Sequence, residues 1–476
     1  MLITLIGRLF QFAIMFASVK IMTNLLTPEE MGKSALIITT TNLFALFLIN
    51  PVGMFLNRRM HAWIDENRFK SYLGLYVGYL IAVASIAAGV LVTAYHLGLD
   101  LGLARLQWML VLVCGSLVFN TISTTLVLAL NMIQRTLAFT LLTLGTLTTC
   151  LCLSIFLNHT GHPSAERWMT GTLIGQTLFA LIAYFVLFRG DVGLRVGPIR
   201  ITSVQWSTIV SFCWPLGLAV LMQWLHMQGY RFLLANRFGL AQLGMYAAGY
   251  GIAASLMSAY ESLLTTWYLP AFYRMANSAD LAERGMAWST YARFMVPASF
   301  LGMTALVAAS PSLPKVLLGS SYHDTGQFVL LGALAEWARM MVGVIGLNAH
   351  LHMKTRRLVL PNLVGAIATY LIMVVMIRPL GLTAAPISVF IGSFTVIAYL
   401  WLFTYRHDPH LTLDWRPFLG SGTLSIFFAV VILLIQSRFT ISKSSGVALL
   451  VCLVVGLIWT GLTGMVVRQD LFKRST

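Results

Sequence analysis

The chain has 476 residues, of which 58% are hydrophobic and only 10% are charged, and its mean hydropathy is +0.83. These values exclude an ordinary soluble protein, which at this length usually divides into several domains, and favour a single membrane domain. The net charge of +16 is typical of cytoplasmic loops enriched in Lys and Arg, so we expect no nucleic-acid partner.

About fourteen apolar runs follow one another along the chain, each roughly 20 or more residues long and able to cross a hydrocarbon core about 30 Å thick. The sequence therefore predicts an all-α integral membrane protein of about 14 transmembrane helices. The first run lacks a basic leader and a cleavage site, so we expect a retained helix rather than a signal peptide. The expected spans are 2–26, 33–57, 71–95, 107–130, 136–157, 168–188, 207–234, 241–269, 287–310, 326–350, 357–377, 382–405, 417–436 and 446–467.

The basic residues between the runs predict the side of the membrane that each gap faces. With a cytoplasmic N-terminus, the inner gaps hold 18 Lys and Arg residues and the outer gaps hold 8. Because cytoplasmic loops are enriched in these residues, both termini are expected in the cytoplasm, with an even number of crossings. Twelve crossings satisfy this rule as well as fourteen, so both counts stay open.

A faint internal repeat divides the chain. Asn24 to Gly32 follows the first span and Asn236 to Gly244 follows the seventh, at an offset of 212 residues. Chance is the alternative, because Asn and Gly are common at helix ends. Two six-span halves in parallel orientation are one known transporter architecture, with the substrate between them. The expected parts are an N-terminal lobe at 1–204, a C-terminal lobe at 205–409 and an additional helix pair at 410–476.

Several stretches of sequence resemble one family. They are Met22-Thr-Asn-Leu-Leu-Thr-Pro-Glu-Glu-Met-Gly32, Asn50-Pro-Val-Gly-Met-Phe-Leu-Asn-Arg-Arg59, Trp214-Pro-Leu-Gly-Leu, Tyr230-Arg-Phe-Leu-Leu and Leu243-Gly-Met-Tyr-Ala-Ala-Gly-Tyr250. With the layout of spans, they resemble the polysaccharide flippase branch of the multidrug/oligosaccharidyl-lipid/polysaccharide exporter superfamily.

The resemblance implies a substrate, an oligosaccharide linked by diphosphate to a polyprenyl lipid, and a groove for the lipid tail at the last two helices. It also implies alternating access in a bacterial cytoplasmic membrane. The chain departs from the family pattern at Asn24, where Arg is frequent, and at Tyr230, where Asp is frequent. Lys20 lies one turn before Asn24 and could replace the missing cation.

Seven charged residues fall inside the expected spans, and five of them are basic. A central Arg or Lys costs roughly 2.5–3.5 kcal/mol on insertion scales, unless it faces a watery cavity, finds a partner or snorkels to an interface. Arg binds phosphate oxygens in a bidentate manner and Lys supplies a point charge. The candidate diphosphate ligands are Arg8, Lys20, Arg231, Arg293 and Arg339.

Glu261 and Glu336 are the two acidic residues inside the spans, and they are our candidates for coupling to H⁺ or Na⁺. Glu336 and Arg339 are three residues apart, so a structural ion pair is the alternative for both. Polar and aromatic residues suit a glycan, although an interfacial aromatic belt explains some of them equally well. The candidate glycan ligands are Gln223, Trp224, Gln228, Tyr230 and Tyr250.

Other motifs are less specific. Gly74-x-x-x-Gly78 and Gly171-x-x-x-Gly175 predict close contacts between helices. The five cysteines lie inside apolar runs, so we expect no disulfide and no metal site. No phosphate-binding glycine loop and no paired carboxylates for catalysis are present, so we expect no enzyme and no cofactor.

The sequence therefore predicts a flippase of lipid-linked oligosaccharide repeat units, acting as a monomer with contacts to glycan polymerase machinery. A multidrug or organic-cation antiporter of the same superfamily is the nearest alternative, although such exporters usually stop at twelve spans. A membrane glycan polymerase or ligase is a second alternative, and the absence of a large outer loop in the predicted topology argues against it. A channel or scaffold without a transport cycle is a third.

Overall fold

The computed structural model describes residues 2–66, 68–98, 106–189, 203–276, 281–351, 358–405, 416–438 and 445–474. These residues form helices and no strand, which confirms the all-α fold class. The elements are α1 (Leu2–Leu25), α2 (Pro28–Phe44), η1 (Ala45–Ile49), α3 (Asn50–Asp65), α4 (Phe69–His96), α5 (Leu106–Gly115), η2 (Ser116–Asn120), α6 (Thr121–Met132), α7 (Thr136–His159), α8 (Ala165–Phe188), α9 (Ser203–Trp224), η3 (Leu225–Gly229), α10 (Tyr230–Phe238), α11 (Leu240–Ala276), α12 (Leu281–Ala309), α13 (Leu313–Leu317), η4 (Ser320–Thr325), α14 (Gly326–Leu351), α15 (Val359–Leu380), η6 (Gly381–Thr383), α16 (Ala384–Tyr399), η7 (Leu400–Tyr405), α17 (Arg416–Arg438) and α18 (Ser445–Arg474).

Ten helical segments of the described chain are long and apolar enough to cross a membrane, so the chain is a multi-pass membrane protein. One of them, Val359–Leu402, has 44 residues and contains both α15 and α16, which pack against each other. Every expected span overlaps a helix, although α1, α11 and α17 do not count among the ten. The number of crossings therefore stays a prediction.

The chain forms two compact units, Met1–Gly244 and Met245–Thr476, which we call unit 1 and unit 2. Unit 1 includes α9 and α10 because α9 packs against α3 and α10 packs against α2. This division reflects packing, whereas the expected lobes reflect the sequence repeat. The lobes at 1–204 and 205–409 and the helix pair at 410–476 stay a prediction.

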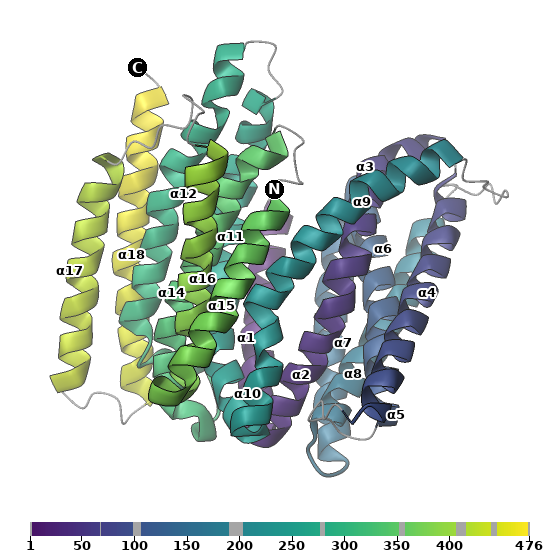
Figure 1. Ribbon diagram of the computed structural model, residues 1–476, viewed down its shortest axis with the longest axis horizontal. Coiled ribbons are helices and arrows are strands. Elements are labelled where there is room, and N and C mark those ends of the chain that lie inside the picture. The colour runs from purple at the N-terminus through teal and green to yellow at the C-terminus, as the bar shows by residue number, and fades with distance from the viewer. Residues whose placement is uncertain are drawn as a thin grey trace. The chain divides into compact units, whose positions relative to one another are not determined.

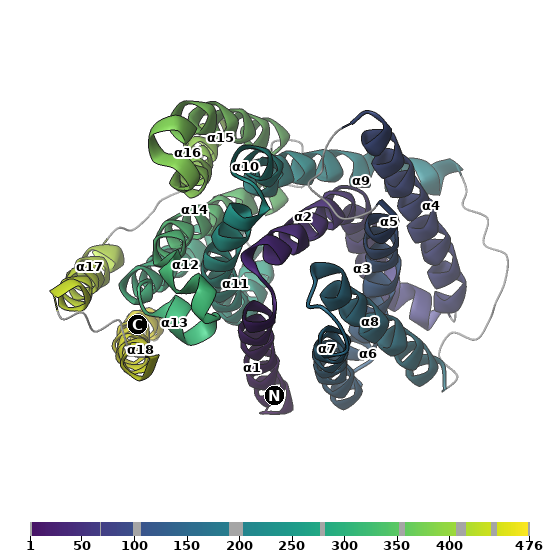
Figure 2. The ribbon, with the colours of Figure 1, turned by 90° about the horizontal axis from the view of Figure 1, so that it is seen from below.

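In unit 1, α7 lies beside α8, α6 and α1 (Figures 1 and 2). A Cβ added at Gly171 on α8 would lie 2.5 Å from the backbone of Ser154, and one at Gly175 would lie 2.6 Å from Sγ of Cys150. The close contact predicted for this glycine pair is therefore confirmed. The same prediction for Gly74 and Gly78 on α4 is wrong, because neither faces a described atom within 4 Å.

Capping interactions join α2 to α8. Thr27 is the N-cap of α2, where its hydroxyl accepts a hydrogen bond from the backbone N–H of Glu30 at 3.4 Å. The Glu30 carboxylate accepts a hydrogen bond from the first N–H of α8, at Ala165, over 2.8 Å, and it also pairs with Lys33 at 2.6 Å. One acidic side chain thus satisfies the positive end of a second helix and fixes the two helix starts together.

The two copies of the sequence repeat contact each other inside unit 1. A Cβ added at Gly32 would lie 2.0 Å from the carbonyl oxygen of Leu240, and one at Gly244 would lie 1.8 Å from that of Pro28. Leu240 and Gly244 stand 212 residues after Pro28 and Gly32, so the two contacts are reciprocal. Such an arrangement is typical of a local pseudo-two-fold axis, and it explains why both copies need glycine.

Unit 2 is organised around α12, which packs against α14, α17 and α18. Buried polar groups attach the last two helices: Gln436 on α17 donates to the carbonyl of Ala308 at 2.8 Å and accepts from Ser312 at 2.7 Å. On α18, Trp459 donates to the hydroxyl of Thr304 at 2.9 Å. Hydrogen bonds between apolar helices act as glue in a membrane, so the helix pair is an integral part of unit 2.

Candidate functional site

Charged residues of unit 2 meet in one cluster between α11 and α14. The Arg339 guanidinium donates from Nε to Glu336 at 2.6 Å and from Nη2 to Glu261 at 2.7 Å. The hydroxyl of Tyr250 donates to the second oxygen of Glu336 at 2.8 Å. Glu336 is almost completely buried, with 5% of its surface exposed. We call Glu261, Glu336, Arg339 and Tyr250 the acidic cluster.

The acidic cluster contains one cationic and two anionic side chains. The ion pair between Glu336 and Arg339, the alternative from their spacing, is present, and Glu261 joins it from 75 positions earlier in the chain. Because two carboxylates already occupy Arg339, the arrangement favours a role in binding cations over a role in binding diphosphate. A proton or Na⁺ would neutralise the carboxylate in excess.

Polar residues of unit 1 form a seam between α2 and the helix that continues from α9 through η3 to α10. Indole Nε1 of Trp224 donates to the carbonyl of Thr39 at 3.2 Å, and Asn42 donates to the side chain of Gln228 at 3.0 Å. Arg231 donates from Nη1 to the hydroxyl of Thr39, also at 3.2 Å. The positions 224, 228 and 231 share one helix face. We call these five residues the polar seam.

Arg231 is the cation of the polar seam, and its charge is not balanced by any carboxylate among the described residues. Its Nε is buried and has no hydrogen-bond partner in the part of the chain that the structure describes. A buried donor without a partner costs roughly 1–3 kcal/mol, and more when it is charged. An anionic ligand that accepts from Nε and an Nη would remove this cost in a bidentate geometry.

The helix that carries Arg231 is irregular at the seam. Residues Leu225–Gly229 form one turn of π-helix, and such bulges are frequent at functional sites because they redirect side chains. Gly239, with φ of 83°, then ends α10 one residue before α11 begins. The bulge contains Gln228 and ends two residues before Arg231, and both of these side chains contact α2.

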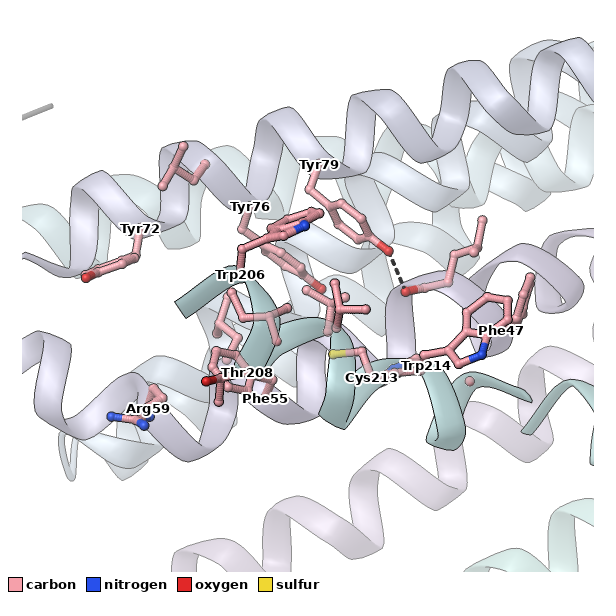
Figure 3. A pocket seen from close by; sticks show the side chains of 18 of the residues that line it. Phe47, Phe55, Arg59, Tyr72, Tyr76, Tyr79, Trp206, Thr208, Cys213 and Trp214 are labelled. Carbon is pink, nitrogen blue, oxygen red and sulfur yellow. Dashed lines mark hydrogen bonds between the residues drawn. The ribbon is translucent and has the colours of Figure 1, made fainter. Parts of the chain in front are cut away.

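A pocket of about 580 Å³ lies elsewhere in unit 1, between α3, α4 and α9 (Figure 3). Its walls are mostly apolar and aromatic, and they include Trp206 and Trp214 on α9. Arg59 lies at one end of the pocket, and the stacked rings of Trp63 and Tyr72, whose centroids are 4.0 Å apart, also line it. The pocket falls within the usual size range of small-molecule sites.

The remaining predicted cations lie on α1 and α12. Arg8 is exposed on α1 and donates to Gln11 at 3.2 Å. Lys20 is half-buried on the same helix, and Arg293 is half-buried on α12. Arg8, Lys20 and Arg231 belong to unit 1, and Arg293 and Arg339 belong to unit 2, so the shared role of the five cations stays a prediction.

The predicted glycan ligands are mostly packed between helices. Trp224 and Gln228 belong to the polar seam, and Tyr230 is fully buried. Tyr250 is bonded to the acidic cluster, and Gln223 is half-buried. Their contact with a glycan stays a prediction that this packing does not favour for Trp224, Tyr230 and Tyr250.

Sequence reasoning missed the α2 half of the polar seam and the pocket. Thr39 and Asn42 belong to the polar run Thr39-Thr-Thr-Asn42 inside an apolar span, and that interruption was the signal that could have found them. The pocket residues carry no such signal, because aromatic residues near helix ends are equally typical of an interfacial belt.

The apolar helices define a multi-pass membrane protein. Residues 21–327, more than half of the chain, match the family model described as "Polysaccharide biosynthesis protein". The chain therefore belongs to the polysaccharide biosynthesis protein family. A comparison with curated proteins finds no match.

Solved structures with the same fold are transporters by their titles. "Lipid II flippase MurJ, inward closed conformation" aligns with a TM-score of 0.68 and 12% identity over 99% of each chain. An inward-facing multidrug resistance MATE family transporter of the MOP superfamily aligns with a TM-score of 0.60 and 15% identity over 82% of this chain and 93% of its own. A eukaryotic MATE transporter aligns with a TM-score of 0.53 and 12% identity over 89% of this chain and 95% of its own. The family match confirms the resemblance to a polysaccharide family that was stated from the sequence, and these structures show the same fold.

Proposed function

We propose that the protein flips polyprenyl-diphosphate-linked oligosaccharide repeat units across a bacterial cytoplasmic membrane by alternating access. The observation that carries the proposal is the match of residues 21–327 to a polysaccharide biosynthesis family in a chain with the fold of a lipid flippase. Fourteen crossings in two repeated lobes and a C-terminal helix pair, with both termini in the cytoplasm, complete the proposal.

Arg231 is the proposed diphosphate ligand. Its buried Nε lacks an acceptor among the described residues, and its neighbour Thr39 is already bonded to the carbonyl of Ala35 at 2.7 Å. A diphosphate oxygen is a strong acceptor and carries the compensating charge. The neutral side chains of Asn42 and Gln228 can form hydrogen bonds to the adjoining sugar once the bond between them is broken.

The acidic cluster is the proposed coupling site. Transporters bind protons through acidic residues buried in their helices, and Glu261 and Glu336 both pair with Arg339. Binding of H⁺ or Na⁺ would balance the cluster and so change which packing of α11 against α14 is favoured. The proposed coupling site therefore belongs to unit 2, and the proposed anion site belongs to unit 1.

The test is reconstitution of the purified full chain into proteoliposomes with a fluorescent oligosaccharide diphosphate lipid. Protein-dependent loss of fluorescence to a reagent that reaches one leaflet only would support flipping. The same vesicles, loaded with an organic cation dye, test the antiporter of the same superfamily. Dye efflux without movement of the lipid would replace the proposal with that alternative, and movement of neither would contradict both.

A further inference from the structure

The pocket between α3, α4 and α9 is amphipathic along its length. Phe47 and Trp214 lie at one end, and Arg59 and Tyr72 lie at the other (Figure 3). From residue 47 to residue 59 the chain is helical, which corresponds to about 18 Å at 1.5 Å per residue. The apolar walls run along this distance, and the basic side chain stands at one end.

A hydrogen bond within the protein occupies one of the polar groups that line the pocket. The hydroxyl of Tyr79, which would otherwise point into the pocket, donates to the carbonyl of Leu48 at 2.7 Å. Tyr76, another tyrosine of the lining, is 5% exposed. The guanidinium of Arg59, by contrast, belongs to an exposed residue and can bind an anion at the end of the pocket.

A ligand that fits this chemistry has an apolar chain that leads to an anionic head. The proposed substrate contains such a junction, where the polyprenyl chain meets the diphosphate. In the predicted topology, the segment after Arg59 faces the cytoplasm, where the head of the lipid would enter. We propose that this pocket binds the polyprenyl chain next to the diphosphate when the lipid enters from the cytoplasm, with Arg59 at the diphosphate before the diphosphate moves on to Arg231; this inference rests on the proposed function.

The proposal differs from the expectation that the last two helices hold the lipid tail. Buried hydrogen bonds at Gln436 and Trp459 attach α17 and α18 to unit 2, whereas the pocket belongs entirely to unit 1. Two locations in different parts of the chain are easily distinguished by chemical labelling.

The experiment uses a polyprenyl diphosphate with a diazirine on the isoprene unit nearest the diphosphate, bound to the full chain in lipid nanodiscs. After irradiation, we expect labelled peptides from 47–63, 72–79 and 206–217. Unlabelled polyprenyl diphosphate should compete, and equal amounts of phosphatidylglycerol or of polyprenol without phosphate should not. Labelling of 416–438 or 445–474 instead, or equal competition by phosphatidylglycerol, would overturn the inference.

Two pairs of variants sharpen the test. Arg59→Gln should weaken binding of polyprenyl diphosphate about tenfold, the equivalent of one charge-assisted hydrogen bond, and leave the polyprenol unaffected. Arg237→Gln, which removes an exposed Arg on α10, is the matched control and should change neither. Equal effects of the two substitutions would contradict a role for Arg59 in the pocket.

A second pair works on the folded protein and so avoids loss of folding. Cys213 lines the pocket, and Cys152 is exposed on α7. In chains that keep only one of these cysteines, a bulky maleimide on Cys213 should abolish photolabelling of 47–63, and the same reagent on Cys152 should not. The flipping assay on the same preparations separates the two claims. Active flipping with labels outside the pocket contradicts only the inference about the pocket, whereas absent flipping contradicts the proposed function.

Discussion

Two arginines inside apolar helices have different surroundings, although their sequence contexts look alike. Arg339 pairs with two carboxylates, while Arg231 keeps a buried Nε without a partner among the described residues. The spacing of Glu336 and Arg339 predicts their contact, because residues three apart share a helix face. The approach of Glu261 depends on how α11 packs against α14, and no local pattern encodes it.

The acidic cluster makes a prediction for stability. Arg339→Gln leaves two carboxylates without their shared cation, so it should lower the free energy of unfolding by about 3 kcal/mol. Glu261→Gln keeps the pair of Arg339 with Glu336 and should cost less. Thermal unfolding of the purified variants in detergent measures both changes.

The double variant Arg339→Gln/Glu261→Gln is the control for this interpretation. It removes the repulsion that the single Arg339 substitution creates, and its stability should exceed that of Arg339→Gln alone because the two sites are in contact. A double variant whose loss equals the sum of the single losses would contradict the electrostatic account.

At the scale of elements, the sequence reveals the repeat of Asn24 to Gly32 at Asn236 to Gly244. It does not reveal that the two copies contact each other. The structure adds that the two copies contact each other through reciprocal glycines. The sequence also predicted close helix contacts at Gly171 and Gly175 correctly and at Gly74 and Gly78 wrongly. Small residues permit close approach, but only the packing of neighbouring helices decides whether they are used.

The reciprocal contact predicts equal effects at its two glycines. Gly32→Ala and Gly244→Ala each place a methyl group within 2.0 Å of a carbonyl oxygen on the other copy, so the helices must separate, at a cost of about 1–3 kcal/mol. Thermal unfolding should show similar losses for both. Gly78→Ala, where a Cβ meets no described atom within 4 Å, is the matched control and should be neutral or stabilising. A loss at only one of the two glycines would refute the reciprocity.

The helix pair α17 and α18 makes a further prediction at this scale. Gln436→Leu removes both hydrogen bonds of the side chain and leaves the carbonyl of Ala308 and the hydroxyl of Ser312 buried without it. We expect a loss of about 1–3 kcal/mol in thermal unfolding. Ser437→Ala, at the neighbouring exposed position, should have little effect, and equal losses at 436 and 437 would argue against the buried attachment.

At the scale of the molecule, apolar runs predicted the all-helical membrane fold because hydrocarbon thickness fixes the length of a span. The sequence did not predict details that depend on packing. Examples are the continuation of α11 to Ala276 and the π-helical turn at Leu225–Gly229. The candidate sites followed the same rule. Charged residues were identified from their cost in a membrane, whereas the pocket beside Trp206 and Arg59 needed the positions of α3, α4 and α9.

The topology is a prediction for the whole chain. The inner gaps carry more Lys and Arg than the outer gaps, so both termini should lie in the cytoplasm. A reporter that is active only in the cytoplasm should therefore be active when it is fused to either terminus. Fusions after residues 32 and 57 should report opposite sides. Termini on opposite sides of the membrane would contradict an even number of crossings.

The most direct test of the account compares two arginines of α10 in the flipping assay. Arg231→Gln removes the buried cation of the polar seam, and Arg237→Gln removes an exposed cation two turns further along. We predict that Arg231→Gln raises the half-saturating concentration of the diphosphate lipid about tenfold, the value of one charge-assisted hydrogen bond, and that Arg237→Gln matches the unmodified protein. Equal flipping by both variants at every lipid concentration would show that Arg231 does not bind the diphosphate.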